Sequence, residues 1–115
     1  MSSPDPTALG RERADQLLAH LEDGDGPGAD AVLAGVDEVR DLVYVGAALT
    51  ALARSEARAL PPAQRAQANT RQLNLGAARD AARTDPAGLR VWLRRAGEEL
   101  LLLRSLRAAA DALAG

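Results

Sequence analysis

Side chains that could catalyse a reaction are scarce in this sequence. The chain has one histidine, His20, and no cysteine. A nucleophile needs a neighbouring base or a lowered pKa to react near neutral pH, and histidine is the usual base. Ser55 and Ser105 have no such partner in the sequence. Glu98 and Glu99 are adjacent, so they point in different directions on a helix. We therefore expect a protein that is not an enzyme and holds no cofactor; the enzymatic alternative is a site spread among carboxylates and arginines.

Metal-ligating side chains are equally sparse. Asp23 and Asp25 precede a glycine, as at the start of a calcium-binding loop. Counting Asp23 as the first position, however, puts Pro27 at the fifth and Ala34 at the twelfth, where a side-chain ligand and a bidentate glutamate belong. His20 has no second histidine or cysteine to share a transition metal with. The sequence therefore predicts an acidic turn here and no metal site.

Arginine supplies all 14 basic residues, and lysine, isoleucine and phenylalanine are missing. This pattern is typical of the codon usage of a GC-rich bacterial genome, so the arginine content needs no functional cause. The charges are nevertheless segregated. Residues 1–53 carry ten acidic and three basic side chains, whereas residues 54–115 carry six acidic and eleven basic ones. Either the two halves pack together and partly neutralise each other, or one of them presents a contact surface of a single sign.

Nucleic-acid binding is the alternative function that this arginine-rich half suggests. Phosphate contacts would come from its guanidinium groups. The candidate residues are Arg79, Arg83, Arg90, Arg94 and Arg95. They are scattered rather than clustered, the chain has a net charge of -2, and no helix-turn-helix signature stands out. Nucleic acid is therefore the second hypothesis and not the first.

A run of four leucines, Leu100 to Leu103, favours a protein partner. Four consecutive residues point around the whole circumference of a helix, and a small bundle covers only part of it. An exposed apolar patch usually marks a partner surface. The first hypothesis is therefore a small adaptor, regulator or inhibitor that forms a homodimer or docks another protein. The expected interface residues are Trp92, Leu100, Leu101, Leu103 and Leu106. For Trp92, a place in the core is the competing interpretation.

The elements that would carry these residues are all helical. Alanine and leucine, with 26 and 19 residues, favour helix over strand. We expect an all-α bundle of four to five helices in one domain over residues 7–115. Residues 1–6 are expected to form a disordered tail, with Asp5 and Pro6 opening the first helix.

Helix boundaries follow from capping residues, glycines and prolines. The first helix should end near Glu22, where a glycine-rich turn over residues 23–28 stops it, and a short helix follows over 29–35. A central apolar helix is expected at about 38–60, capped by Asp37, enclosed by its neighbours and ended by Pro61 and Pro62. A weaker helix over 62–83 carries plausible interruptions at 69–70 and 74–76. A long C-terminal helix is expected at about 86–113.

The expected location is the cytoplasm. A chain without cysteine has no disulfide framework and suits a reducing compartment. The longest uncharged stretch, residues 42–53, would span about 18 Å as a helix, which is shorter than the roughly 30 Å apolar core of a bilayer. We therefore expect no membrane-spanning segment.

Overall fold

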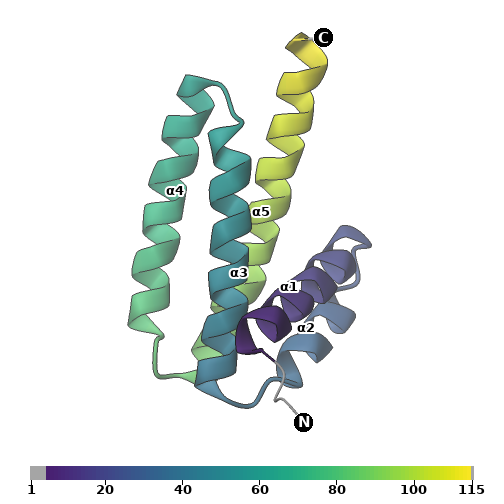
Figure 1. Ribbon diagram of the computed structural model, residues 1–115, viewed down its shortest axis with the longest axis vertical. Coiled ribbons are helices and arrows are strands. Elements are labelled where there is room, and N and C mark those ends of the chain that lie inside the picture. Colours follow the sequence, from purple (N-terminus) through teal and green to yellow (C-terminus); the bar gives the residue numbers. More distant parts are fainter. Residues whose placement is uncertain (1–4, 115) are drawn as a thin grey trace.

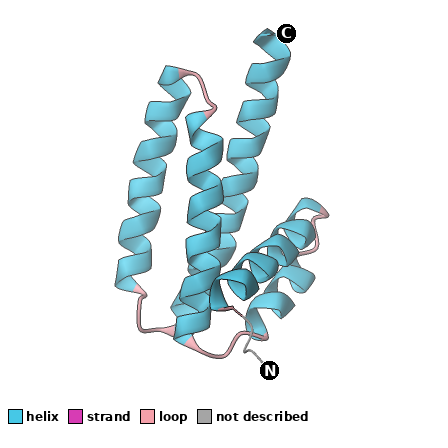
Figure 2. Cartoon of the chain, in the orientation of Figure 1, coloured by secondary structure: helices cyan, strands magenta, loops and turns pink. Residues whose placement is uncertain are grey.

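The computed structural model describes residues 5–114 and confirms an all-α fold. Within this range it contains five helices and no strand (Figures 1 and 2). They are α1 (Pro6–Glu22), α2 (Gly26–Ala34), α3 (Val39–Arg58), α4 (Pro62–Ala81) and α5 (Pro86–Ala114). Residues 1–4 of the expected tail lie outside the described residues. Asp5 and Pro6 cap and begin α1, as the sequence predicts, so these two residues are not part of a disordered tail.

Both ends of α1 show why the sequence begins and ends a helix there. The Asp5 carboxylate accepts a hydrogen bond from the backbone N–H of Thr7 at 3.0 Å, which satisfies one free donor of the first turn. At the other end, Gly24 adopts a left-handed backbone with φ of 71°. This conformation lets the N–H of Asp25 reach the carbonyl of His20 at 2.8 Å. Glycine is favoured at this position because residues with a side chain rarely adopt a left-handed backbone.

Two of the remaining helices differ from the sequence-based boundaries. Helix α2 begins at Gly26 rather than at residue 29, because the side chain of Asp25 caps the N–H of Gly28 and proline is compatible with the first turn. Helix α3 begins at Val39 after Glu38, which makes no side-chain cap, so the expected cap at Asp37 is wrong.

Helix α4 is continuous through both expected interruptions. The hydroxyl of Thr70 donates to the carbonyl of Ala66 at 3.2 Å. A threonine that bonds back to the preceding turn in this way is compatible with a helical backbone. Asn74 and Gly76 lower the helix propensity of the segment without ending it.

The long helices α3, α4 and α5 run side by side, and α1 and α2 pack across the half of the bundle that holds the turn between α4 and α5 (Figure 1). Helix α3 contacts α1, α4 and α5, whereas α5 contacts all four other helices. The 29 residues of α5 would span about 43 Å at 1.5 Å per residue. This helix therefore sets the 47 Å long axis of the molecule.

The core is apolar and continuous. It is formed mainly by leucines, of which Leu17, Leu42, Leu49, Leu93 and Leu100 are among the most deeply buried. Gly46 of α3 allows the ring of Trp92 to approach, because a Cβ at this position would lie 3.0 Å from Cζ3 of the indole. The missing side chain of Gly46 thus lets α5 pack closely against α3.

One face of α3 is open to solvent, which corrects the expectation that neighbours enclose this helix on every side. Val43 is 49% exposed, and Ala47 and Ala51 are also exposed. Helix α4 leans on α3 over only a small area. The five helices are too few to surround α3, so part of its apolar surface stays uncovered.

The two halves of opposite charge meet in the folded chain. Arg94 of α5 binds Asp30 of α2 at 2.7 Å, and Arg104 lies 3.7 Å from Glu22 at the end of α1. Arg90 also joins the halves, since its guanidinium donates to the carbonyl of Val36 at 2.8 Å. These contacts support partial neutralisation between the halves as the account of the charge segregation.

Candidate functional site

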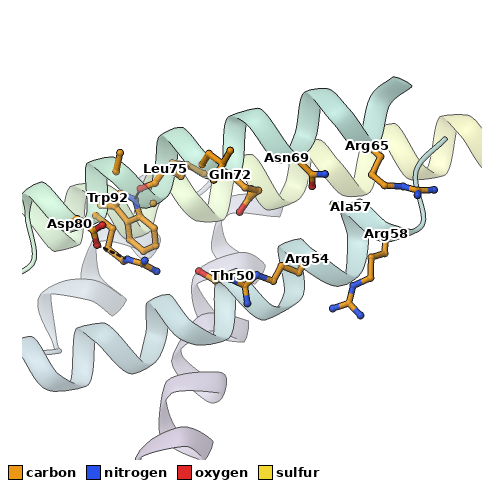
Figure 3. Close-up of a pocket in the computed structure, with 14 residues that line it drawn as sticks. Thr50, Arg54, Ala57, Arg58, Arg65, Asn69, Gln72, Leu75, Asp80 and Trp92 are labelled. Atoms are coloured by element: carbon orange, nitrogen blue, oxygen red, sulfur yellow. Dashed lines mark hydrogen bonds and ion pairs between the residues drawn. The ribbon is translucent and has the colours of Figure 1, made fainter. Parts of the chain in front are cut away.

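A groove lies between α3 and α4, and α5 closes one end of it (Figure 3). We call it the α3–α4 groove; its volume is about 750 Å³. Figure 3 shows Thr50, Arg54 and Arg58 on the α3 side. Asn69 and Gln72 face them from the α4 side.

The composition of α4 is the reason that this groove stays open. Over its 20 residues α4 buries only Ala68 and Leu75. Alanine side chains are too short to fill the space between two helices, so the helix is held along one narrow line of contact. A hydrogen bond adds to this contact, because the indole N–H of Trp92 donates to the carbonyl of Leu75 at 2.7 Å.

The groove is strongly basic. Four arginines line it, whereas Asp80 is the only acidic residue among its lining residues. The arginines are Arg54 and Arg58 of α3 and Arg65 and Arg79 of α4. Helix α4 contributes to this sign because residues 57–79 carry four arginines and no carboxylate.

The arginines of the groove differ in how far they are bound within the chain. Arg79 lies over the ring of Trp92, with 5.8 Å between its Cζ and the ring centroid, and 3.7 Å from Asp80. Arg65 donates to the backbone carbonyl of Leu60 at 3.1 Å. Within residues 5–114, neither Arg54 nor Arg58 has a carboxylate within 4 Å. The α3 side therefore presents two guanidinium groups that are free to bind an anion.

Apolar groups accompany these charges. Leu73, on the outer rim of the groove, is 75% exposed, while Leu75 and Trp92 form part of its inner wall. The open face of α3 continues the apolar surface beyond Thr50 to Ala47 and Val43, since residues three and four apart share one side of a helix. The site thus combines a basic end with an apolar rim.

The interface expected on α5 is largely inside the protein. Trp92, Leu100 and Leu103 are buried core residues and offer a partner little surface, and Leu101 and Leu106 are partly buried against the core. The physical reason is that α5 contacts all four other helices. These contacts bury more of its circumference than would be buried if α5 packed only along the edge of the bundle. Of the leucine run, Leu102 is the exposed member, at 37%.

The five arginines expected to bind nucleic acid do not form one surface, although Arg90, Arg94 and Arg95 line a second hollow of about 550 Å³ together with Asp30 and Glu98. Arg90 donates to the carbonyls of Leu33 and Val36 at the end of α2. Arg94 is bound by Asp30, whose hydrogen bond raises the pKa of this guanidinium. Arg83 and Arg95 are exposed, and Arg79 alone lines the groove.

The acidic turn between α1 and α2 is held by hydrogen bonds among its own residues and His20. Nδ1 of His20 lies 3.0 Å from Oδ2 of Asp25, and Oδ1 of Asp25 accepts the N–H of Gly28 at 2.9 Å. The backbone bond from Gly28, followed by the contact with His20, lowers the pKa of Asp25. Among residues 5–114, no three side chains of His, Cys, Asp or Glu are grouped so that they could hold a metal ion.

From the sequence, Arg54, Arg58 and Arg65 are members of the eleven scattered arginines of residues 54–115 that could contact phosphate, and they are not predicted to form one site. A signal was present, because Arg54 and Arg58 are four residues apart and precede a long segment without acids. What the sequence lacked was the position of α4 beside α3.

Comparison with known proteins found no matching family model, curated protein or solved structure. No helix within residues 5–114 is both long and apolar enough to cross a bilayer.

Proposed function

We propose that this protein is a non-enzymatic interaction module that docks a segment of another protein in the α3–α4 groove. One observation carries the proposal: an open groove of about 750 Å³ combines an exposed leucine with two arginines that have no carboxylate partner within the described chain. Exposed apolar surface beside unpaired charge is typical of a partner-binding site. The proposal moves the expected interface from the leucines of α5 to the neighbouring groove.

The chemistry of the lining residues supports a binding role over a catalytic one. The groove offers guanidinium and amide groups, one hydroxyl at Thr50 and one carboxylate at Asp80. The carboxylate of Asp80 lies 3.7 Å from the guanidinium of Arg79 and forms an ion pair with it. No nucleophile and base stand together among these residues, as covalent or acid-base catalysis would require.

We place this module in the cytoplasm, because a domain of 115 residues without cysteine has no disulfide to protect it outside the cell. Its partner would be another protein of the same compartment. Nucleic acid remains the competing partner, since arginine binds phosphate as readily as carboxylate.

Selection from a random peptide library displayed on phage tests the proposal. The full chain serves as bait, and the variant Gln72→Trp places a large ring in the groove. Gln67→Trp is the matched control, because Gln67 is exposed on α4 and does not line the groove. We expect enriched peptides that bind the wild type and Gln67→Trp but not Gln72→Trp. Enriched peptides that bind all three equally, or no enrichment, would refute docking in the groove.

A further inference from the structure

From the shape and charge of the α3–α4 groove, we infer that its occupant is an acidic amphipathic α-helix. The inference rests on the proposed function and adds the chemical class of the partner. The lining residues of α4 extend from Arg65 to Asp80, a distance of about 22 Å along the helix axis. A partner helix of about four turns matches this length.

Charge complementarity determines the acidic character. Four arginines face one aspartate in the groove, and Arg54 and Arg58 have no carboxylate partner within residues 5–114. Arg58 and Arg65 flank the turn between α3 and α4, whereas Asp80 and Trp92 lie at the opposite end (Figure 3). The carboxylates of the partner would therefore lie near this turn, because at the other end Asp80 offsets the charge of Arg79.

The walls of the groove determine the helical character. Both walls are α-helices, whose backbone N–H and C=O groups are already bonded within each helix. An extended peptide would find no backbone partners there and would leave its own polar groups unpaired. A helix satisfies its backbone internally, and its apolar stripe can contact Leu73, Leu75 and the open face of α3.

Nucleic acid fits this groove less well than a helix does. Single strands are held by bases that stack on exposed aromatic rings. The only aromatic residue of the groove is Trp92, which is buried and already covered by Arg79. A duplex, for its part, is too wide to enter a groove between two helices. The net charge of -2 also opposes the general attraction of a polyanion.

Calorimetric titration of the full chain tests the inference. The probe is a peptide of about 16 residues with a leucine stripe and glutamates beside it. A second peptide has lysine in place of glutamate. A third has the composition of the acidic peptide in an order that abolishes the leucine stripe. An oligothymidylate is the polyanion control. We expect the acidic amphipathic peptide to bind, its affinity to fall with salt, and the other three probes to bind at least about tenfold more weakly.

The double variant R54E/R58E should bind the acidic peptide with about tenfold lower affinity and the lysine peptide with higher affinity, since the charge of the α3 wall is reversed. Arg95→Glu is the matched control, because Arg95 is an exposed arginine of α5 that lines the second hollow and not the groove. Circular dichroism verifies that each variant is folded, and R54Q/R58Q replaces the double variant if it is not.

Each contrary outcome has a distinct meaning. Equal binding of the reordered peptide would overturn the helical occupant. Tighter binding of the oligothymidylate would overturn the protein partner in favour of nucleic acid, and with it the proposed function. If neutral peptides selected from the library bind in a way that Gln72→Trp abolishes, while the acidic peptide does not bind, the inference fails and the proposed function stands.

Discussion

Leucines that are neighbours in the sequence of α5 have different environments in this protein. Leu100 and Leu103 are buried in the core, whereas Leu102 between them is partly exposed. The sequence shows that the run points in all directions, but burial depends on which helices surround α5. That information comes from the packing of α1, α3 and α4, which no local pattern contains. This is why the expected interface residues turned out to be core.

The substitution Leu103→Asp tests this assignment. We expect it to abolish folding or to lower the free energy of unfolding by about 4 kcal/mol or more, because it removes a packed side chain and buries a carboxylate. Leu102→Asp, at a position that is 37% exposed, is the control and should remain folded. Thermal unfolding followed by circular dichroism measures both. A folded Leu103→Asp chain that loses only self-association would restore the interface on α5.

Asp25 gives the protein a pH-dependent contribution to stability. Its pKa is lowered from the ordinary value of 3.8 by the N–H of Gly28 and by His20. A lowered pKa in the folded state means that the ionised form stabilises the fold. The contribution is therefore complete above about pH 4 and is lost as the pH falls through the lowered pKa.

The variant Asp25→Asn keeps an oxygen that can accept from Gly28 but carries no charge. We expect the wild type to melt at a higher temperature than the variant at about pH 5, and the difference to shrink towards about pH 2. Thermal unfolding across this range measures the difference. A difference that is the same at every pH would contradict the role of the charge.

Most helix boundaries could be predicted because they depend on local chemistry. Asp5, Pro62 and Pro86 mark the starts of helices through capping and the missing N–H of proline, and the structure has helices there. The start of α2 at Gly26 is not predicted, because glycine and proline are typical of turns. Both residues are nevertheless allowed in the first turn of a helix. The groove could not be predicted, since it arises from two helices that the sequence does not place side by side.

At the scale of the helices, glycines differ in whether the missing side chain is needed for two helices to approach each other. At Gly10 of α1, a Cβ would lie 2.7 Å from the backbone oxygen of Tyr44, so α1 and α3 approach too closely for any side chain. At Gly76 of α4, a Cβ would meet no atom within 4 Å. The first glycine is required by helix packing, whereas the second is not.

This contrast predicts opposite effects of one substitution. Gly10→Ala should destabilise the fold by about 1–3 kcal/mol, because the rigid backbone of α3 cannot move away. Gly76→Ala should stabilise it by up to about 1 kcal/mol, because alanine is the better helix former. Urea denaturation measures both free energies of unfolding. Equal effects of the two substitutions would show that α1 and α3 are more loosely packed than the structure indicates.

At the scale of the whole molecule, the opposite charges of the two halves meet through a few arginines of α5. Within the arginine-rich half, Glu56 of α3 adds a further contact with α5, because its side chain is only 16% exposed and accepts a hydrogen bond from Arg107 at 3.0 Å. Arg104 lies 3.6 Å from the same carboxylate. This bond to Glu56 also raises the pKa of Arg107. One partly buried carboxylate therefore joins α3 to the upper part of α5.

Glu56→Gln should accordingly lower the free energy of unfolding by about 1 kcal/mol, because two guanidinium groups lose a partly buried partner. Asp15→Asn is the control, since its pair with Arg11 is more than half exposed on both sides and should contribute less than about 0.5 kcal/mol. Urea denaturation at low salt measures both. Losses of the same size would mean that solvent screens the contact at Glu56 as fully as an exposed pair.

Trp92 is the only tryptophan of the chain, and it stands between the core and the α3–α4 groove. Its emission spectrum is therefore a natural optical reporter with two separable signals. Unfolding exposes the indole to water and shifts the emission maximum to longer wavelength. A partner that draws Arg79 away from the ring changes the emission intensity. Because the protein stays folded, the wavelength of the emission maximum does not change. The molecule thus carries its own label at the site where a ligand would arrive.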